Sequence, residues 1–240
     1  KVYVIGMGPG AYEQMTVKAI RTLEKCDVIV GYTVYIELLK EHFPDKRYLT
    51  TSMRQEAERC RMAFEEAKKG AVTAMVCSGD AGIYGMAGLM YEIGEEYPEV
   101  AIEVIPGVTA ALGGSAVLGA AVGHDVSLIS LSDLLTPWEL IEERLRCAAK
   151  ADFVICLYNP SSRKRSTYLA KACELILEYK SEDTVCGIVK NIAREGEQMQ
   201  TLTLKELKET TVDMFSTVFI GNKQTKVIRE KMVTPRGYRI

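Results

Sequence analysis

Three glycine-rich segments each follow a short apolar run of the sequence, at places where backbone could approach a bound ligand. They are Gly6–Ala11, Ser78–Gly85 and Pro106–Ala110. Glycine permits backbone conformations and close approaches that a Cβ atom would block. Ligands of parallel α/β sheets bind beyond the carboxyl ends of the strands. If the three apolar runs are parallel strands of one sheet, the sequence predicts a single binding site built from three loops.

The first segment formally matches the dinucleotide fingerprint G-x-G-x-x-G/A, but two features argue against that ligand. Pro9 has no backbone N–H, so one donor that a phosphate would need is missing. The acidic residue that would bind the ribose is also missing, because Asp27 precedes the second apolar run instead of following it. A tight turn before a helix explains this motif as well as a ligand contact does, and we do not expect a nicotinamide dinucleotide.

Polar side chains in the other two segments allow two interpretations each. Asp80 could accept hydrogen bonds from ribose hydroxyls or an amino group, or it could cap a helix expected to begin near Tyr84. Thr109 could cap the next helix and also line the same site. The sequence leaves both pairs of alternatives open.

The elements that must position these segments alternate between strand and helix. In the first half, strands are expected at residues 2–5, 28–30, 72–77 and 101–105, and helices at 15–25, 53–69 and 84–95. Such alternation with short connections predicts a mostly parallel sheet covered by helices on both faces.

A second unit follows the Gly/Ala-rich stretch 107–123, which we expect to be a buried, closely packed helix at a domain junction. Strands are expected at residues 126–131, 153–157, 185–190, 198–203 and 217–220, and helices at 138–149, 167–179 and 204–208. The last three strands follow one another closely, which favours some antiparallel pairing. The prediction is an α/β fold with two α/β domains, 1–108 and 126–240, joined by 109–125.

Composition limits the partners and the compartment. The chain has 240 residues, 48% of them hydrophobic, which is enough to bury a sizeable core. Lys and Arg total 30 against 32 for Asp and Glu, so we expect no nucleic-acid partner. The apolar runs are far shorter than a membrane span, and we expect no membrane association. Seven cysteines without a C-x-x-C pair indicate reduced, buried thiols and a cytoplasmic protein, and two distant histidines give no metal site.

In order and spacing, the three glycine segments resemble those of the tetrapyrrole (class III) methyltransferases. The resemblance covers nearly the whole chain, although Ala81 stands where much of the family has proline. It implies a tetrapyrrole methylase fold, with S-adenosylmethionine bound in a cleft between the two α/β domains and S-adenosylhomocysteine as product. It also implies a homodimer. The resemblance places the following residues at the cofactor: Pro9, Gly79, Asp80, Ile83, Tyr84, Thr109, Ala110, Tyr158, Asn191, Ile192 and Thr217.

Three further segments resemble one branch of this family, the C17-methyltransferases of precorrin-3B or cobalt-precorrin-3 in cobalamin synthesis. They are Gly31–Tyr35, His124–Trp138 and Leu157–Ser162. The resemblance implies methylation of ring carbon C17 coupled to contraction of the macrocycle. Whether the substrate carries cobalt is not encoded in the protein, because the macrocycle would hold the metal.

The chemistry of such a reaction selects a few side chains. Methyl transfer from a sulfonium is an in-line displacement that needs positioning more than a base, whereas ring contraction requires proton transfers. For those transfers the candidates are His124, Ser130 and Asp133. His124 could equally bond backbone at the junction, and Asp133 is better interpreted as a cap of the helix near Pro137.

The carboxylates of a tetrapyrrole need cationic partners, and one basic run follows the Asn-Pro-Ser-Ser turn. It consists of Arg163, Lys164 and Arg165. A solvated basic turn is the alternative. Two other functions also remain open for the chain. One is a sister corrin methyltransferase acting at another carbon, and the other is a non-catalytic module that binds S-adenosylmethionine or a nucleotide.

Overall fold

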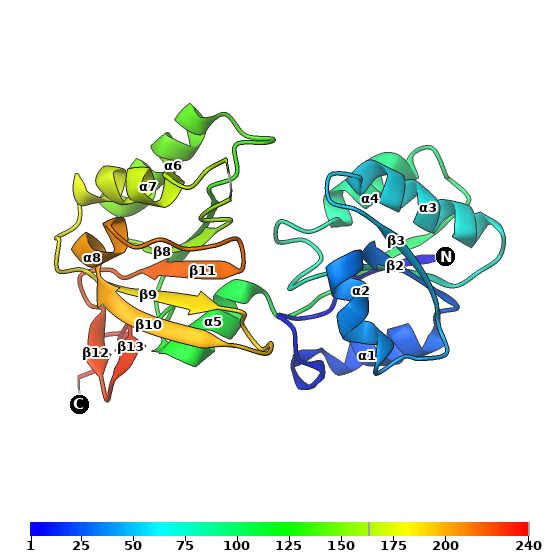
Figure 1. Cartoon of the computed structure of the whole chain (residues 1–240), viewed down its shortest axis with the longest axis horizontal. Helices are drawn as coiled ribbons and strands as arrows, with labels where there is room; N and C mark the ends of the chain where they lie inside the picture. The colour runs from blue at the N-terminus through cyan, green and yellow to red at the C-terminus, as the bar shows by residue number, and fades with distance from the viewer. Residues whose placement is uncertain (163, 240) are drawn as a thin grey trace. The chain divides into compact units, whose positions relative to one another are not determined.

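The computed structural model describes residues 1–162 and 164–239 of the chain. It contains two compact units, unit 1 from Lys1 to Ala110 and unit 2 from Ala111 to Ile240. Both are α/β, as predicted (Figure 1). The finer division, with 109–125 as a separate junction segment, stays a prediction.

Unit 1 is built on a five-stranded sheet in the order β3-β2-β4-β1-β5, and every described strand pair in it is parallel. The strands are β1 (Val2–Gly6), β2 (Val28–Tyr32), β3 (Arg47–Thr51), β4 (Thr73–Cys77) and β5 (Ile102–Ile105). The helices are η1 (Tyr12–Gln14), α1 (Val17–Lys25), α2 (Thr33–Lys40), α3 (Glu56–Lys68) and α4 (Ala87–Gly94).

Helices cover both faces of this sheet because alternate residues of each strand point to opposite sides. In β1, Val2 and Val4 pack in the cluster that contains α3 and α4, whereas Ile5 packs with α1 and α2 (Figure 1). Strands buried on both faces read as continuous apolar runs, which is the pattern that predicted them. The parallel sheet thus brings the carboxyl ends of β1, β4 and β5 to one edge.

Unit 2 has a mixed sheet in the order β10-β9-β11-β8-β7. Its strands are β7 (Val126–Ser130), β8 (Val154–Tyr158), β9 (Val185–Lys190), β10 (Gln198–Thr203) and β11 (Ser216–Ile220). β7 and β8 are parallel, while the pairs that involve β9, β10 and β11 with one another or with β8 are antiparallel. The antiparallel pairing expected for the last three strands is therefore confirmed.

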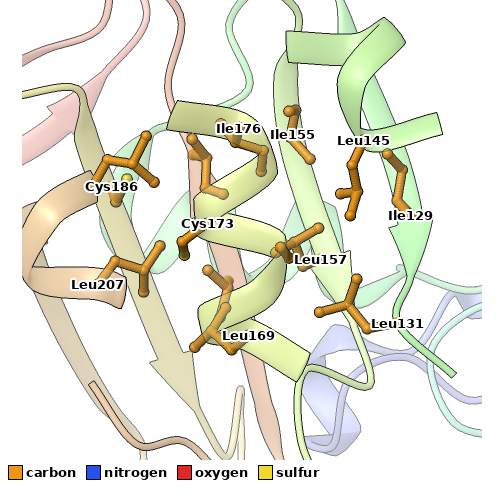
Figure 2. Close-up of a cluster of buried hydrophobic side chains, with 14 of the residues drawn as sticks. Ile129, Leu131, Leu145, Ile155, Leu157, Leu169, Cys173, Ile176, Cys186 and Leu207 are labelled. Atoms are coloured by element: carbon orange, nitrogen blue, oxygen red, sulfur yellow. The ribbon is translucent and has the colours of Figure 1, made fainter. Parts of the chain in front are cut away.

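One face of the unit 2 sheet carries α6 (Trp138–Lys150), α7 (Tyr168–Leu177) and α8 (Leu204–Lys208). Figure 2 shows the core between them, where Leu157 of β8 and Cys186 of β9 meet Leu169 and Cys173 of α7 and Leu207 of α8. These side chains are at most 2% exposed. They come from four elements, so this core depends on contacts between residues distant in sequence.

The Gly/Ala-rich stretch forms α5 (Ala110–Leu118), a closely packed helix as predicted. A Cβ atom on Gly114 would lie 2.7 Å from the ring of Phe219, so only glycine fits against β11 there. The chain then enters a small sheet in the order β12-β13-β6, formed by β6 (Gly119–Ala120), β12 (Lys226–Ile228) and β13 (Lys231–Val233).

Six of the described elements were not expected from the sequence: η1, α2, β3, β6, β12 and β13. β3 is an edge strand whose sequence, Arg-Tyr-Leu-Thr-Thr, lacks a continuous apolar run. All three residues of β12 are exposed. Strands that bury little apolar surface give no strong sequence pattern.

No helix among residues 1–162 and 164–239 is both long enough and apolar enough to cross a bilayer.

The seven cysteines differ sharply in accessibility, since six are buried and Cys147 on α6 is exposed. Burial raises the pKa of the Cys26 and Cys77 thiols to about 11 and that of Cys60 to about 12. Because the thiolate is the reactive form, we expect one maleimide adduct per native chain near neutral pH and seven after denaturation. Intact-protein mass spectrometry counts the adducts, and two or more on the native chain would contradict the assignment.

Candidate active site

The three glycine segments lie against one another at the carboxyl edge of the unit 1 sheet. The first two are joined by a pair of backbone hydrogen bonds, from Gly8 N to Gly79 O at 3.0 Å and from Gly79 N to Gly8 O at 2.7 Å. Both residues have positive φ, 75° and 69°, which glycine adopts without strain. The predicted convergence of the loops is therefore present in the structure.

Close contact between the loops explains why glycine is required at two further positions. A Cβ atom on Gly107 would lie 2.2 Å from Gly79 O and 2.6 Å from Gly6 O. On Gly6, it would lie 2.7 Å from Gly107 N. These glycines permit contact between one loop and the next, whereas the sequence suggested contact with a ligand.

Asp80 fastens the second loop to the third. Its Oδ1 accepts hydrogen bonds from the backbone N–H groups of Gly82 (2.8 Å) and Ile83 (3.1 Å), and its Oδ2 accepts one from Gly107 N (3.0 Å). The interpretation of Asp80 as a helix cap is wrong, because α4 begins only at Ala87 and has no side-chain cap. Asp80 is thus an anchor between loops at the predicted cofactor edge.

The other unit 1 residues predicted at the cofactor lie at or near this edge. Pro9 is buried beside the Gly8–Gly79 pair, and Thr109, 9% exposed, occupies the position before the first residue of α5. A Cβ on Gly79 would lie 3.6 Å from Thr109 Cα and 3.7 Å from Ala110 N. Farther along the second loop, two apolar side chains are exposed: Ile83 (38%) and Tyr84 (53%).

No lysine or arginine occurs in the three glycine segments, and their one acidic residue is Asp80. A pyrophosphate would need cations or free backbone donors, whereas Pro9 supplies no N–H and the Gly107 N–H is already bonded to Asp80. The chemistry of this edge therefore fits a ligand without phosphate groups.

In unit 2 the four predicted cofactor residues lie at one edge of the sheet. Tyr158 ends β8, Asn191 and Ile192 follow β9, and Thr217 lies near the start of the antiparallel β11. The hydroxyl of Tyr158 accepts a hydrogen bond from the N–H of Ala111 in the first turn of α5, at 2.9 Å. Asn191 has φ of 52°, a conformation that asparagine tolerates well.

Ser130 and Asp133 belong to a hydrogen-bonded network at the same edge of unit 2. Ser130 Oγ accepts from Asn159 Nδ2 at 2.9 Å, which ties the end of β7 to the loop after β8. Asp133 accepts from Tyr168 Oη at 2.7 Å and from Arg165 Nη1 at 3.3 Å. Two of the three segments that resemble the C17-methyltransferase branch, His124–Trp138 and Leu157–Ser162, therefore meet in space.

Both partners keep Asp133 ionised, because the hydroxyl of Tyr168 and then the guanidinium of Arg165 lower the pKa of its carboxyl group. A carboxylate with a lowered pKa is a weak general base near neutral pH. The interpretation of Asp133 as a helix cap is wrong, since Pro137 is the N-cap residue of α6 and no side chain caps that helix. Its carboxylate accepts hydrogen bonds from Tyr168 and Arg165 instead.

The structure does not bring His124 to the other two predicted catalytic residues. His124 precedes β7, whereas Ser130 ends that strand, and β7 alone spans about 13 Å. The Nδ1 atom of His124 accepts a hydrogen bond from Asp125 N at 2.9 Å, so this histidine bonds to backbone. Its ring borders a cavity of about 200 Å³ that Asp152 and Asn222 also line.

The predicted substrate cations have different environments. The side chain of Arg165 is 14% exposed and that of Lys164 lies at the surface, while Arg163 lies outside the described residues. In addition to Asp133, Arg165 Nη1 donates to Ser132 Oγ at 2.8 Å. The guanidinium of Arg165 is therefore largely buried and fixed by hydrogen bonds, so the alternative of a solvated basic turn does not describe this residue.

Among residues 1–162 and 164–239, no group of three or more His, Cys, Asp or Glu side chains is placed to hold a metal ion. The profile of the family described as Tetrapyrrole (Corrin/Porphyrin) Methylases matches residues 1–208. The chain belongs to the tetrapyrrole methylase family.

This tetrapyrrole methylase is similar to curated proteins over almost its whole length. It is 47% identical to a probable cobalt-factor III C(17)-methyltransferase of Salmonella typhimurium, over 98% of each chain. It is 35% identical to a precorrin-3B C(17)-methyltransferase of a Sinorhizobium species, over 99% of this chain and 96% of the other. The crystal structure of the methyltransferase CobJ superposes with a TM-score of 0.89 at 32% identity, covering 98% of this chain and 99% of that one.

Sequence reasoning missed two members of the unit 2 network in this tetrapyrrole methylase, Tyr168 and Asn159. Asn159 stands in the Tyr-Asn-Pro-Ser-Ser segment, and it adopts a positive φ of 51°, which asparagine tolerates. No local pattern marks Tyr168, because its partner Asp133 lies 35 residues earlier in the chain.

Proposed function

We propose that this chain transfers a methyl group from S-adenosylmethionine to C17 of a precorrin-3 macrocycle and takes part in the accompanying ring contraction. The observation that carries the proposal is the 47% identity, over 98% of both chains, to a protein named for C17 methylation of cobalt-factor III. That value exceeds the 35% identity to the protein named for metal-free precorrin-3B, which favours the cobalt-containing substrate. The macrocycle, not the protein, would carry the cobalt.

S-adenosylmethionine supplies an electrophilic methyl group on a sulfonium. The unit 1 loops suit such a cofactor because they carry the carboxylate of Asp80 and no cation. Asp80 shapes the second loop through its bonds to Gly82 and Ile83, and its bond to Gly107 ties that loop to the third. The proposal also assigns Pro9, Gly79 and the other predicted cofactor residues to the binding of S-adenosylmethionine.

In unit 2 the proposed task is to orient the macrocycle and to move protons during contraction. Arg165 and Lys164 offer positive charge for acetate or propionate groups of the substrate. Ser130 is placed next to Asn159 and keeps a hydroxyl proton to donate, so among the predicted catalytic residues it fits proton transfer best. The displacement at the methyl group itself requires no base.

Incubation with cobalt-factor III and carbon-13-methyl-labelled cofactor tests the function, followed by mass spectrometry and carbon-13 NMR of the product. We expect one new methyl group at C17 and a contracted ring. Label at another ring carbon would assign the chain to a sister corrin methyltransferase. Stoichiometric cofactor binding without turnover of cobalt-factor III or precorrin-3B would favour a non-catalytic binding module.

Removing the Asp80 carboxylate is expected to weaken cofactor binding. Asp80→Ala breaks two hydrogen bonds within the second loop and one to the third loop, and losing charge-assisted bonds costs about 1.5–3 kcal/mol. The dissociation constant of S-adenosylhomocysteine, measured by calorimetry, should rise about ten- to a hundredfold.

The matched control for Asp80 is Asp27→Ala. Asp27 Oδ2 also accepts a backbone N–H, from Val72 at 2.8 Å, but at the amino end of β2. This variant should lose some stability and keep the wild-type affinity. Equal loss of affinity in both variants would mean that Asp80 acts only through the stability of unit 1.

We further propose that the protein acts in the cytoplasm as a homodimer. All seven cysteines are free, which suits a reducing compartment. Homodimerisation is supported by the family resemblance alone. Light scattering that gives the mass of a single chain at micromolar concentration would contradict it.

A further inference from the structure

Both carboxylate oxygens of Asp133 are engaged by residues from the start of α7 and the turn before it. Tyr168 Oη donates to Oδ2 at 2.7 Å, and Arg165 Nη1 lies 3.3 Å from Oδ1. Because Tyr168 fixes one oxygen, the carboxylate plane is held while the other oxygen faces Arg165. Tyr168 therefore acts on Arg165 through Asp133.

The guanidinium of Arg165 is fixed by hydrogen bonds from one of its nitrogen atoms, whereas another nitrogen is buried without an acceptor among the described residues. Its side chain is 14% exposed, and its hydrogen bonds to Ser132 and Asp133 both start from Nη1. Among the residues that the structure describes, the buried Nε of Arg165 has no hydrogen-bond partner. A buried N–H without an acceptor is costly, and a carboxylate is the acceptor that a guanidinium binds best.

The charge around Arg165 also suits an anion. Asp133 balances one positive charge, and Lys164 next to it adds a second at the surface. We propose that Tyr168 is a positioning residue that orients Arg165 through Asp133, so that Arg165 receives a carboxylate of the tetrapyrrole. This inference rests on the proposed function, because it takes the substrate class from it.

A built-in reporter lies beside this network. Trp138 is the only tryptophan of the chain, and its ring centroid is 4.4 Å from that of Tyr168. Its Nε1 donates to Glu142 Oε1 at 2.6 Å, which fixes the indole on α6. A coloured macrocycle bound at Arg165 should therefore quench the tryptophan fluorescence, and this measures binding without turnover.

The test compares Tyr168→Phe with Tyr179→Phe. Both changes remove one phenolic hydroxyl, but Tyr179 lies two residues beyond α7 and outside the network, 42% exposed. In Tyr168→Phe we expect the KM for cobalt-factor III and its dissociation constant from fluorescence to rise about three- to tenfold. The kcat and the affinity for S-adenosylhomocysteine should stay within about twofold of wild type, and Tyr179→Phe should match wild type throughout.

A second variant, Asp133→Asn, keeps the shape of the side chain and removes its charge. It should raise the same KM, and adding Tyr168→Phe to it should cost little more, because the two residues act through one contact. Thermal unfolding of all variants checks that each one folds.

An unchanged KM in a folded Tyr168→Phe variant would overturn the positioning role. A fall in kcat at constant KM, with a shifted pH profile, would overturn it as well and assign Asp133 to proton transfer. Wild-type protein that binds cobalt-factor III without methylating it would refute the proposed function, yet weaker binding by Tyr168→Phe would still support positioning. Wild-type protein that neither binds nor methylates the macrocycle would refute both.

Discussion

Gly107→Ala is expected to destabilise unit 1 by about 3 kcal/mol or more and to abolish cofactor binding. The new Cβ atom would lie 2.2 Å from Gly79 O and 2.6 Å from Gly6 O, which are backbone atoms that cannot rotate away. The three loops would have to separate, and this separation would break the hydrogen bond from Gly107 N to Asp80. Circular dichroism during urea unfolding measures the stability, since the only tryptophan, Trp138, lies in unit 2.

Gly88→Ala is the control for Gly107→Ala. Gly88 is exposed in α4, and nothing lies within 4 Å of a Cβ atom built there. In a helix, alanine is more favourable than glycine by about 0.5–1 kcal/mol, so this variant should be as stable as wild type or more so. Wild-type stability of Gly107→Ala would show that the loops can move apart freely.

Asp152→Asn is expected to lower the free energy of unfolding of unit 2 by about 3–5 kcal/mol. Asp152 Oδ1 lies 2.9 Å from Nζ of Lys180, whose side chain is only 3% exposed. The substitution leaves a buried ammonium facing a neutral amide. Asn preserves the backbone, because it tolerates the positive φ of 60° that Asp152 adopts. The midpoint of thermal unfolding, monitored by Trp138 fluorescence, should fall by about 6–20 °C.

Two further variants separate the buried charge from other effects at Asp152. Asp183→Asn makes the same chemical change at an exposed position of unit 2 and should alter stability by less than about 0.5 kcal/mol. Adding Lys180→Met to Asp152→Asn removes the uncompensated charge and should restore much of the stability. If the double variant is no more stable than Asp152→Asn, the loss of stability comes from the weakened hydrogen bond that Asp152 accepts from Lys223 N.

The meeting of the unit 1 loops could be predicted from sequence because its signals are local. Each glycine segment follows an apolar strand, and parallel strands end at the same edge of their sheet. What the glycines contact could not be inferred, since Gly6, Gly79 and Gly107 meet only after strands far apart in sequence have paired. The carboxylate of Asp80 was found from its residue type, whereas its bond to Gly107 depends on the same pairing.

The unit 2 network was harder to infer, because residues that are close in sequence lie far apart in space when an extended strand separates them. His124 and Ser130 are six residues apart, yet β7 separates them. Asp133 seemed a cap for the helix that follows it, but its partners Arg165 and Tyr168 lie more than thirty residues later. Side-chain partners of this kind are fixed by the packing of α7 against the sheet, and no local pattern records them.

The position of β1 between β4 and β5 has a consequence for synthesis on the ribosome. β1 pairs with β4 and β5, whose residues lie as far along the chain as Ile105. At about 5–20 residues per second, roughly 5–20 s pass between emergence of the first strand and of its last partner. The β9–β10 pair, in contrast, joins residues Val185 to Thr203 and can form within a second or a few. During translation, β1 therefore has both of its partner strands only when almost the whole of unit 1 has been made, and its apolar side chains need protection meanwhile.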